Sequence, residues 1–379
     1  MTQSRLKIVV AVVFLLSCIL LIVCINNDAA HRTIIDAIVK NREENQEKKH
    51  VAQVRKAAEQ GDAESQYLIG NDYFISAFQP GAPEDRYLEE AKKWYRKAAE
   101  QGHVEAQYSL AGCYNRVMIY YRSDDIFIPS NPEETVVWYR KAAEQGHVGA
   151  QIKLGEYYDK GWGAPQDKTN AMKWYREAAE QDHREAQITL GDYYFKGEGV
   201  PQDKAEAVNW YRKAADGGDT TALCLLADCY FDGEGVPQDK EKAVEIWRIA
   251  GNQNSITARY RLALCYFEGD GVPQDKEEAV RLLELLCKIH PKFGTEAFHK
   301  LAEWYYDGEG VTQDRAKAAE YFREAAGWGD ADAEYRLGKC YHDGEGVPQS
   351  KTDAIKWLQK AAGQGHKEAT DLLRQIEGK

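Results

Sequence analysis

Short glycine-containing segments that recur along the chain are the first candidates for chemistry. The segment Gly197 to Lys204 (GEGVPQDK) has a Gly-x-Gly spacing like that of loops that bind phosphate through backbone N–H groups. Close variants begin at Gly161, Gly233, Gly269, Gly308 and Gly344. No strand pattern precedes these segments, and loops repeated at a fixed spacing cannot all converge on one phosphate. The repetition therefore indicates turns between helices rather than a nucleotide site.

Acidic and histidine side chains near these turns are candidates for metal ligands. The acids Asp232, Glu234 and Asp239 do not follow the order of an EF-hand loop, and Asp239 is placed to cap a helix. One turn position holds histidine repeatedly, at His103, His147, His183 and His366. A metal site needs ligands that converge within about 2 Å of one ion, and a column with one member per repeat does not provide that. The sequence predicts neither a metal nor another cofactor.

Cysteine and serine nucleophiles are the remaining candidates for catalysis. Of eight cysteines, Cys113, Cys229, Cys265 and Cys340 occupy one repeated position, immediately before a tyrosine. Successive members of this column are separated by a whole helical hairpin, roughly 10 Å at helix packing distances, which is too far for a disulfide, so buried free thiols are expected. The only Ser-x-x-Lys motif is Ser4 to Lys7, without the companion motifs of penicillin-recognising enzymes. With no non-repeating set of nucleophile, base and orienting group, the chain is predicted not to be an enzyme.

Composition bears on the class of partner. The net charge is −12 and the isoelectric point is about 5.4. Nucleic-acid binding needs concentrated Lys and Arg, so this balance argues against a nucleic-acid partner. Mild acidity is otherwise typical of a well-solvated protein surface.

An apolar segment near the N-terminus predicts a membrane anchor. Ile8 to Ile25 are 18 consecutive residues without a charge, preceded by Arg5 and Lys7. A helix of that length spans roughly 27 Å, close to the thickness of the hydrocarbon core of a bilayer. A cleaved signal peptide and a lipoprotein signal ending at Cys18 are the alternatives, but the residues after Ile25 form a poor cleavage site. An uncleaved transmembrane helix over residues 8–25 is therefore preferred.

The flanking segments complete this assignment. Residues 1–7 are expected in the cytoplasm, because positive residues precede the apolar segment. Residues 26–50 carry a short apolar stripe and then a charged run, which predicts a helical stalk. The remaining chain, 51–379, is then expected outside the cytoplasm.

Residues 51–379 are built from a repeat. One small-residue position recurs at Ser65, Ala106, Ala150, Ala186, Ala222, Ala258, Ala297, Ala333 and Ala369. Most successive members are 36 residues apart, and three intervals are longer. A period of this length with helical patterning is typical of stacked helix-turn-helix units.

The fourth unit illustrates the expected fold. A first helix is predicted from about Arg184 to Phe195, with Ala186, Leu190 and Tyr194 on one buried face. The following glycines allow the chain to reverse, and Asp203 is placed to cap the second helix. That helix is predicted from about Lys204 to Ala215, with Trp210 filling the volume between small residues.

This pattern resembles the Sel-one-like repeat, a relative of the tetratricopeptide repeat. The matching residues of the fourth unit are Ala186, Leu190, Gly191, Tyr194, Gly197, Gly199, Val200, Asp203, Ala207, Trp210, Ala214, Ala215 and Gly218. The resemblance implies an all-α, right-handed α/α superhelical solenoid whose concave face binds proteins or peptides. It also implies adaptor roles in signalling, in membrane-associated complexes or, in bacteria, in the envelope and in host contact. A cysteine-rich bacterial branch is associated with penicillin binding or hydrolysis, but this chain lacks that branch's cysteine pair in each repeat.

Two sets of residues are predicted to contact a partner. The first is an apolar insertion in the second unit, which contains Ile119, Tyr120, Tyr121, Ile126 and Phe127. Such a loop is either a contact element or a cap over the end of the array. The second set is a basic column along the first helices, at Lys153, Arg261, Lys300 and Arg336. Some of these residues are i, i+3 salt-bridge partners, such as Lys153 with Glu156. The same column would nonetheless line the concave face and favour an acidic partner.

Together these features predict about eight helical hairpins and a C-terminal cap helix on a single membrane anchor. The expected function is a non-enzymatic scaffold for a protein or peptide partner. The alternatives are a secreted repeat effector and, less favoured, a penicillin-binding or penicillin-hydrolysing enzyme.

Overall fold

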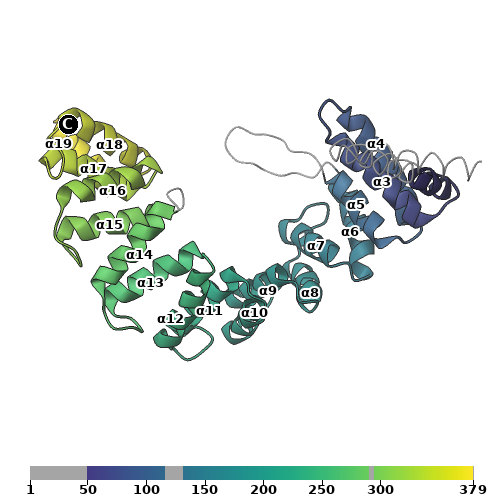
Figure 1. Cartoon of the computed structure of the whole chain (residues 1–379), viewed down its shortest axis with the longest axis horizontal. Helices are drawn as coiled ribbons and strands as arrows, with labels where there is room; N and C mark the ends of the chain where they lie inside the picture. Colours follow the sequence, from purple (N-terminus) through teal and green to yellow (C-terminus); the bar gives the residue numbers. More distant parts are fainter. Residues whose placement is uncertain (1–48, 116–130, 290–293, 379) are drawn as a thin grey trace, which may run out of the picture. The chain divides into compact units, whose positions relative to one another are not determined.

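The computed structural model describes residues 49–115, 131–289 and 294–378. Within these ranges all regular structure is helical, as the sequence predicts (Figure 1). The chain divides into two compact units, one ending at His147 and the other comprising Val148–Lys379. The proposed anchor at 8–25, and all but the last two residues of the proposed stalk at 26–50, lie outside the described residues. No helix within the described ranges is both long enough and apolar enough to span a bilayer.

The first unit contains two complete hairpins, preceded by a helix over residues 49–59. Its labelled helices are α3 (Ala63–Ala77), α4 (Glu84–Glu100), α5 (Val104–Tyr114) and α6 (Pro132–Glu144). The connection between α3 and α4 is short, because α4 begins directly after Pro83 with Glu84 and Asp85 in its first turn. Acidic side chains stabilise the first turn of a helix through its dipole.

The second unit consists of six hairpins and a final single helix. Its helices are α7 (Val148–Lys160), α8 (Lys168–Ala179), α9 (Arg184–Lys196), α10 (Lys204–Asp216), α11 (Thr220–Asp232), α12 (Lys240–Asn252), α13 (Ile256–Glu268), α14 (Lys276–Ile289), α15 (Thr295–Asp307), α16 (Arg315–Gly327), α17 (Ala331–Asp343), α18 (Lys351–Gly363) and α19 (Lys367–Glu377). Odd-numbered helices are the first helices of the repeats, and even-numbered ones are the second helices. The predicted limits of the fourth repeat each differ from α9 and α10 by at most one residue.

The buried faces follow the predicted pattern with one difference. Ala186, Leu190 and Trp210 are almost completely buried. Tyr194 is only half-buried, because its hydroxyl lies at the repeat boundary and accepts a hydrogen bond from Arg176 of the preceding second helix. The neighbouring Tyr193 is the more buried tyrosine of α9.

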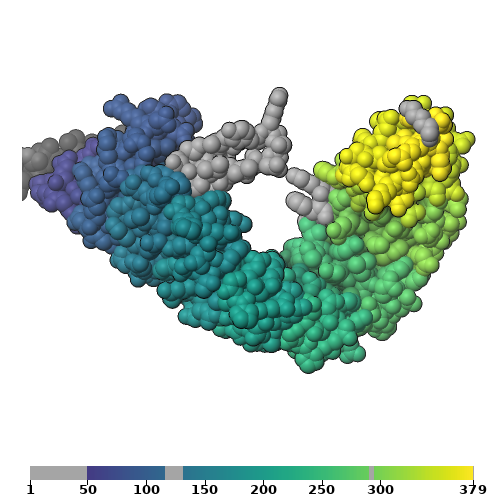
Figure 2. All heavy atoms as spheres, turned by 180° about the vertical axis from the view of Figure 1, so that it is seen from behind, coloured from purple at the N-terminus to yellow at the C-terminus, as the bar shows by residue number. Residues whose placement is uncertain are grey.

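Each repeat of the second unit packs on its neighbours in the sequence. Contiguous apolar clusters join successive hairpins, with small residues at the closest approaches and larger ones between them. Figure 2 shows the same order on the surface of this unit, where the colour passes gradually from teal to yellow. The core is therefore distributed along the array, as is typical of a solenoid.

The recurring Gly-x-Gly segment connects the two helices of one repeat and also packs on the preceding repeat. Gly197 ends α9 in the left-handed conformation (φ 74°), and the side chain of Asp203 accepts a hydrogen bond from the backbone N–H of Glu206 at 3.0 Å. The second glycine also has positive φ and packs on the preceding repeat: an added Cβ on Gly235 would lie 2.2 Å from the carbonyl oxygen of Lys204. The segment thus sets the spacing of the hairpins, in agreement with its assignment as a turn.

Candidate interaction surface

The first helices of the second unit present a continuous exposed surface, called here the first-helix face. It consists of the exposed side chains of α7, α9, α11, α13, α15, α17 and α19. Because ordered helices support it, its side chains are held in place before any partner arrives.

The structure places the predicted basic column on this face but shows that most of its members are paired. Lys153 Nζ lies 2.8 Å from Glu156, and Lys300 Nζ lies 2.8 Å from Glu303. Arg261 Nε approaches Asp228 at 3.5 Å. Arg336 is exposed and forms no ion pair with any described residue. Of the four predicted residues, Arg336 therefore has the guanidinium most readily available to a partner.

The other predicted set cannot be placed. Ile119, Tyr120, Tyr121, Ile126 and Phe127 all lie in 116–130, outside the described residues.

Arg336 lines a charged hollow at the C-terminal end of the face. It has a volume of about 260 Å³ and lies between α15, α17 and α19. Its lining residues are His299, Glu303, Asp332, Tyr335, Arg336, His366 and Glu368. Both signs of charge are therefore present within one small concavity.

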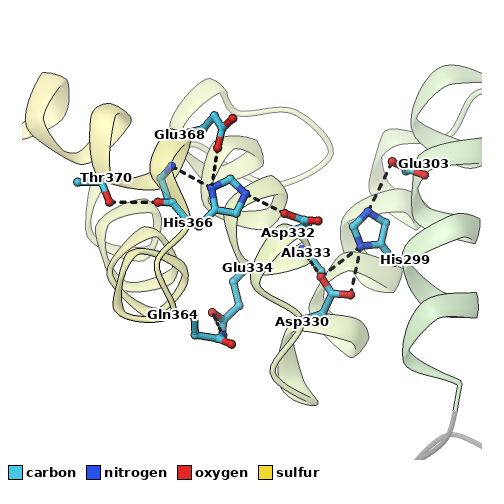
Figure 3. A network of polar contacts seen from close by, with 11 residues as sticks. His299, Glu303, Asp330, Asp332, Ala333, Glu334, Gln364, His366, Glu368 and Thr370 are labelled. Atoms are coloured by element: carbon cyan, nitrogen blue, oxygen red, sulfur yellow. Dashed lines mark hydrogen bonds and ion pairs between the residues drawn. The ribbon is translucent and has the colours of Figure 1, made fainter. Parts of the chain in front are cut away.

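His299 is the centre of the polar network on one side of this hollow. Its Nδ1 lies 3.2 Å from Asp330 Oδ1, and its Nε2 lies 3.5 Å from Glu303 Oε1 (Figure 3). Asp330 also accepts a hydrogen bond from the backbone N–H of Ala333, so it caps α17 as well as holding the imidazole. The His299–Asp330 contact thereby ties α15 to the next repeat.

This environment changes the protonation of His299. Burial opposes the charged imidazolium, but hydrogen bonds to Asp330 and Glu303 outweigh it and raise the pKa of His299 to about 9. The hydrogen bond from His299 lowers the pKa of Glu303 to about 2, against the effect of burial. Burial likewise opposes ionisation of Asp330, whose pKa is lowered by its hydrogen bond from His299. At neutral pH the group is thus a protonated histidine between two carboxylates.

His366 forms the opposite side of the hollow. Its Nδ1 accepts a hydrogen bond from the backbone N–H of Ala369 and so caps α19, while its Nε2 lies 2.9 Å from Asp332. The imidazole also stacks on Tyr335, with ring centroids 4.6 Å apart. His103 makes the same kinds of contact in the first unit, with Ala106, Glu64 and Tyr67. The histidine column therefore caps helices, and among the described residues no cluster suited to a metal ion occurs.

A second hollow lies beside the first and shares helix α15 with it. It has a volume of about 350 Å³ and lies mainly between the N-terminal parts of α13 and α15. Ile256, Tyr260 and Leu286 give it an apolar lining, and Thr257 and Glu296 are exposed at it. The first-helix face thus combines a partly apolar hollow and a charged hollow within neighbouring repeats.

The cysteines are consistent with structural roles. All six in the described ranges are buried thiols outside any disulfide, as the sequence predicts. Burial raises the pKa of Cys229 to about 12 and that of Cys340 to about 11. Thiols of this kind are poor nucleophiles at neutral pH.

Sequence reasoning missed His299. The signal was present, because His299 occupies the position of Tyr67, Tyr108, Tyr260 and Tyr335 in other repeats. The turn position that holds histidine elsewhere is Asp330 in the following repeat. At this boundary a histidine–aspartate pair replaces the tyrosine–histidine pair of other boundaries. It is the one boundary in the described chain with such a pair.

Comparison with known proteins agrees with this architecture. The model of the Sel1 repeat matches eight segments, 63–103, 104–147, 148–183, 184–219, 220–255, 256–288, 295–327 and 331–366. The chain belongs to the Sel1 repeat family. Proteins built from Sel1 repeats generally mediate protein–protein interactions.

Two solved structures are similar to this Sel1 repeat chain over most of its length. One is c5321, a protective antigen of uropathogenic Escherichia coli with an SLR fold: it is 32% identical, has a TM-score of 0.68, and the match covers 86% of this chain and 67% of that one. The other is a Sel1 repeat protein from Oxalobacter formigenes, which is 31% identical with a TM-score of 0.71, over 86% of this chain and 89% of that one. No match was found among the curated proteins compared with this chain.

Proposed function

We propose that this Sel1 repeat protein is a membrane-anchored, non-enzymatic scaffold that binds a segment of a partner protein on its first-helix face. The observation that carries the proposal is the pair of neighbouring hollows on that face, one partly apolar and one charged, both lined by α15. A binding surface for a protein segment needs an apolar anchor point and polar groups that fix its orientation.

One hollow provides the apolar anchor point, and the other provides the polar groups. The hollow at Tyr260 accepts a large apolar side chain, since its lining is already half-buried and loses little mobility on binding. In the other hollow, Arg336 supplies an unpaired guanidinium for a carboxylate of the partner. The carboxylates of Asp332 and Glu368, which lie beside His366, disfavour a second acidic group of the partner and so set the register of the bound segment.

The anchor in this proposal is residues 8–25, with residues 1–7 in the cytoplasm and the repeats outside it. The support is the length and apolarity of that segment. N-terminal sequencing of the mature protein tests the anchor, because a start beyond residue 26 would indicate a secreted protein. A C-terminal reporter that is active only in the cytoplasm would contradict the orientation.

Site-specific photo-crosslinking in the native membrane tests the binding surface. A photoreactive residue at Thr257, which is exposed in the apolar hollow, is expected to yield a discrete adduct with one partner. The substitution Arg336→Glu is expected to reduce that adduct at least tenfold, because one bound segment spans both hollows. A photoreactive residue at Glu324, exposed on the second helix α16, is the matched control. Equal adducts from Thr257 and Glu324, or no effect of Arg336→Glu, would contradict the proposal.

A further inference from the structure

One exposed position on the second helices departs from the repeat pattern in two adjacent units. This position lies three residues after the column that usually holds tryptophan. It is charged in six units, at Lys97, Lys141, Glu177, Lys213, Glu324 and Lys360. In the fifth and sixth units it is Ile249 and Leu285.

The usual lysine covers an aromatic ring. Lys213 Nζ lies 3.8 Å from the ring centroid of Trp210, and Lys141 Nζ lies 4.0 Å from that of Trp138. In the sixth unit the tryptophan itself is replaced by Leu282. Ile249 is 51% exposed and Leu285 is 40% exposed, so aliphatic surface faces solvent where other repeats present a charge.

Leu285 lines a hollow between α12, α13 and α14, and Ile249 lies on α12 directly after Arg248, which lines the same hollow. Its volume is about 290 Å³, and Leu262, Leu282 and Leu285 contribute its apolar lining. Gly251 also lines it, at a position that is alanine in six other units. Gly251 is within a helix and has no positive φ, so the backbone does not require glycine there. An added Cβ would lie 3.4 Å from Cγ of Arg259 and 3.5 Å from Cδ1 of Leu262, so the missing methyl group enlarges the hollow.

Two arginines give this hollow a positive charge. Arg259 replaces the buried glutamine of other repeats; its Nε donates to the carbonyl oxygen of Gly251 at 3.0 Å and its Nη2 donates to Asn254 at 2.7 Å. Arg248 also lines the hollow and is exposed. Neither arginine forms an ion pair with any described carboxylate. The acid in the lining, Glu278, is engaged by Arg281 at 2.5 Å.

We propose that this hollow is a second docking site, which takes an amphipathic helix of a partner protein with large apolar side chains on one face and acidic residues beside them. The exposed Ile249 and Leu285 receive the apolar face, and a leucine-sized side chain enters the hollow. The unpaired charges of Arg248 and Arg259 select acidic flanks. A second copy of this chain is a poorer fit, because a symmetric contact would bring like-charged arginines together.

This site is independent of the first-helix face. The exposed residues Ile249, Leu285 and Arg248 lie on second helices, whereas the crosslinking surface proposed above lies on first helices. The two surfaces would allow one scaffold to hold two partners.

Fluorescence anisotropy with a designed peptide tests the site. The probe is an 18-residue peptide with leucine at i, i+3, i+4 and i+7 spacing and glutamate at most other positions, and its counterpart carries lysine in place of glutamate. The full chain is held in phosphatidylcholine nanodiscs, and empty nanodiscs give the background. The acidic peptide is expected to bind at least tenfold more tightly than the basic one.

Substitutions then locate the binding. Ile249→Lys with Leu285→Lys is expected to weaken the acidic peptide at least tenfold, and the fold should tolerate this change because other units have lysine there. Arg248→Glu is expected to reduce the preference for the acidic peptide. Glu324→Lys, at the equivalent position of another unit, is the matched control and is expected to leave binding unchanged.

Equal binding of both peptides, or unchanged binding after the double lysine substitution, would overturn the proposal. So would self-association of the chain, or recruitment of phosphatidylserine vesicles, if the double substitution abolishes it. Circular dichroism and thermal unfolding of each variant separate loss of binding from loss of fold.

Discussion

The side-chain oxygen of Gln187 is buried without a hydrogen-bond partner in the described chain, because Gly217 occupies the position of its usual donor. One repeat earlier, Gln181 Nε2 donates to Gln151 Oε1 at 2.8 Å. The same contact joins Gln101 to Gln66, Gln145 to Gln107 and Gln364 to Glu334. In each of these repeats the contact thus holds the end of the second helix to the first helix, and in the repeat that contains Gln187 the donor is missing.

Restoring that donor is expected to stabilise the second unit. Gly217 has helical dihedrals (φ −72°), and an added Cβ would meet only the flexible side chain of Arg184 and a carbonyl oxygen at 3.0 Å or more. Gly217→Gln is therefore expected to raise the free energy of unfolding by about 1–2 kcal/mol, from a buried hydrogen bond and the loss of glycine. Gly217→Ala should give only about 0.5 kcal/mol. Urea unfolding of both variants checks this.

A background substitution isolates the hydrogen bond. The position of Gln187 is leucine in the next repeat, at Leu223, which is buried there. In a Gln187→Leu background, the difference between the glutamine and alanine variants of residue 217 should disappear. If it persists, the gain does not come from the Gln187 contact.

Some glycines with positive φ have open space around an added Cβ, and others pack against the preceding repeat. Alanine substitution is expected to destabilise the fold much more at the packed glycines. Gly218 has φ 86° and nothing within 4 Å of an added Cβ, so Gly218→Ala should cost only the left-handed strain of about 1–2 kcal/mol. In Gly235→Ala the new methyl group would collide with the backbone of Lys204, which adds a packing penalty of roughly 1–3 kcal/mol. Hydrogen exchange of amides in α10 to α12 measures the difference. Similar opening free energies for the two variants would show that Gly235 does not set the spacing of repeats.

Much of this fold is predictable because its determinants are local. Asp203 caps α10 and Gly197 ends α9 through contacts within a few residues, so their roles follow from residue type and spacing alone. The repetition of the pattern then indicates a solenoid, and the structure confirms the helical hairpins.

The candidate surface was less predictable because its contacts join residues about 30 positions apart. The pairing of Lys300 with Glu303 is an exception, because the two residues are three positions apart on one helix and such a pair follows from spacing alone. His299 meets Asp330 only after two helices have packed together. The hollow beside Gly251 depends on one missing methyl group and its neighbours across three helices, which a repeat pattern does not reveal.

The buried cysteines are expected to resist alkylation in the folded chain. Burial raises the pKa of Cys229 and of Cys287 to about 12, so the thiolate is scarce at pH 7.5. Iodoacetamide labelling, followed by peptide mass spectrometry, should be at least a hundredfold slower at these two residues than in urea-unfolded protein. Rapid labelling of either cysteine in the folded chain would contradict its structural role.

The histidine that joins α15 to the next repeat is expected to make stability depend on pH. The pKa of His299 is about 9 in the folded chain, against an ordinary value of 6.5. Folding therefore favours the protonated form, and the resulting stabilisation is fully present below pH 6.5 and is lost as the pH rises through 9. The expected loss between pH 6 and pH 10 is at most about 3 kcal/mol, measured by urea unfolding.

Two variants separate this effect from other titrations. His299→Tyr installs the residue found at this position in other repeats, and should remove most of the pH dependence between 6 and 9. Asp330→Ser keeps a capping side chain, as Ser255 shows at the equivalent position, but removes the carboxylate that holds the imidazolium. It should reduce the slope because the remaining carboxylate, Glu303, lies at the longer distance of 3.5 Å. An unchanged slope in both variants would mean that the protonated His299 does not hold the two repeats together.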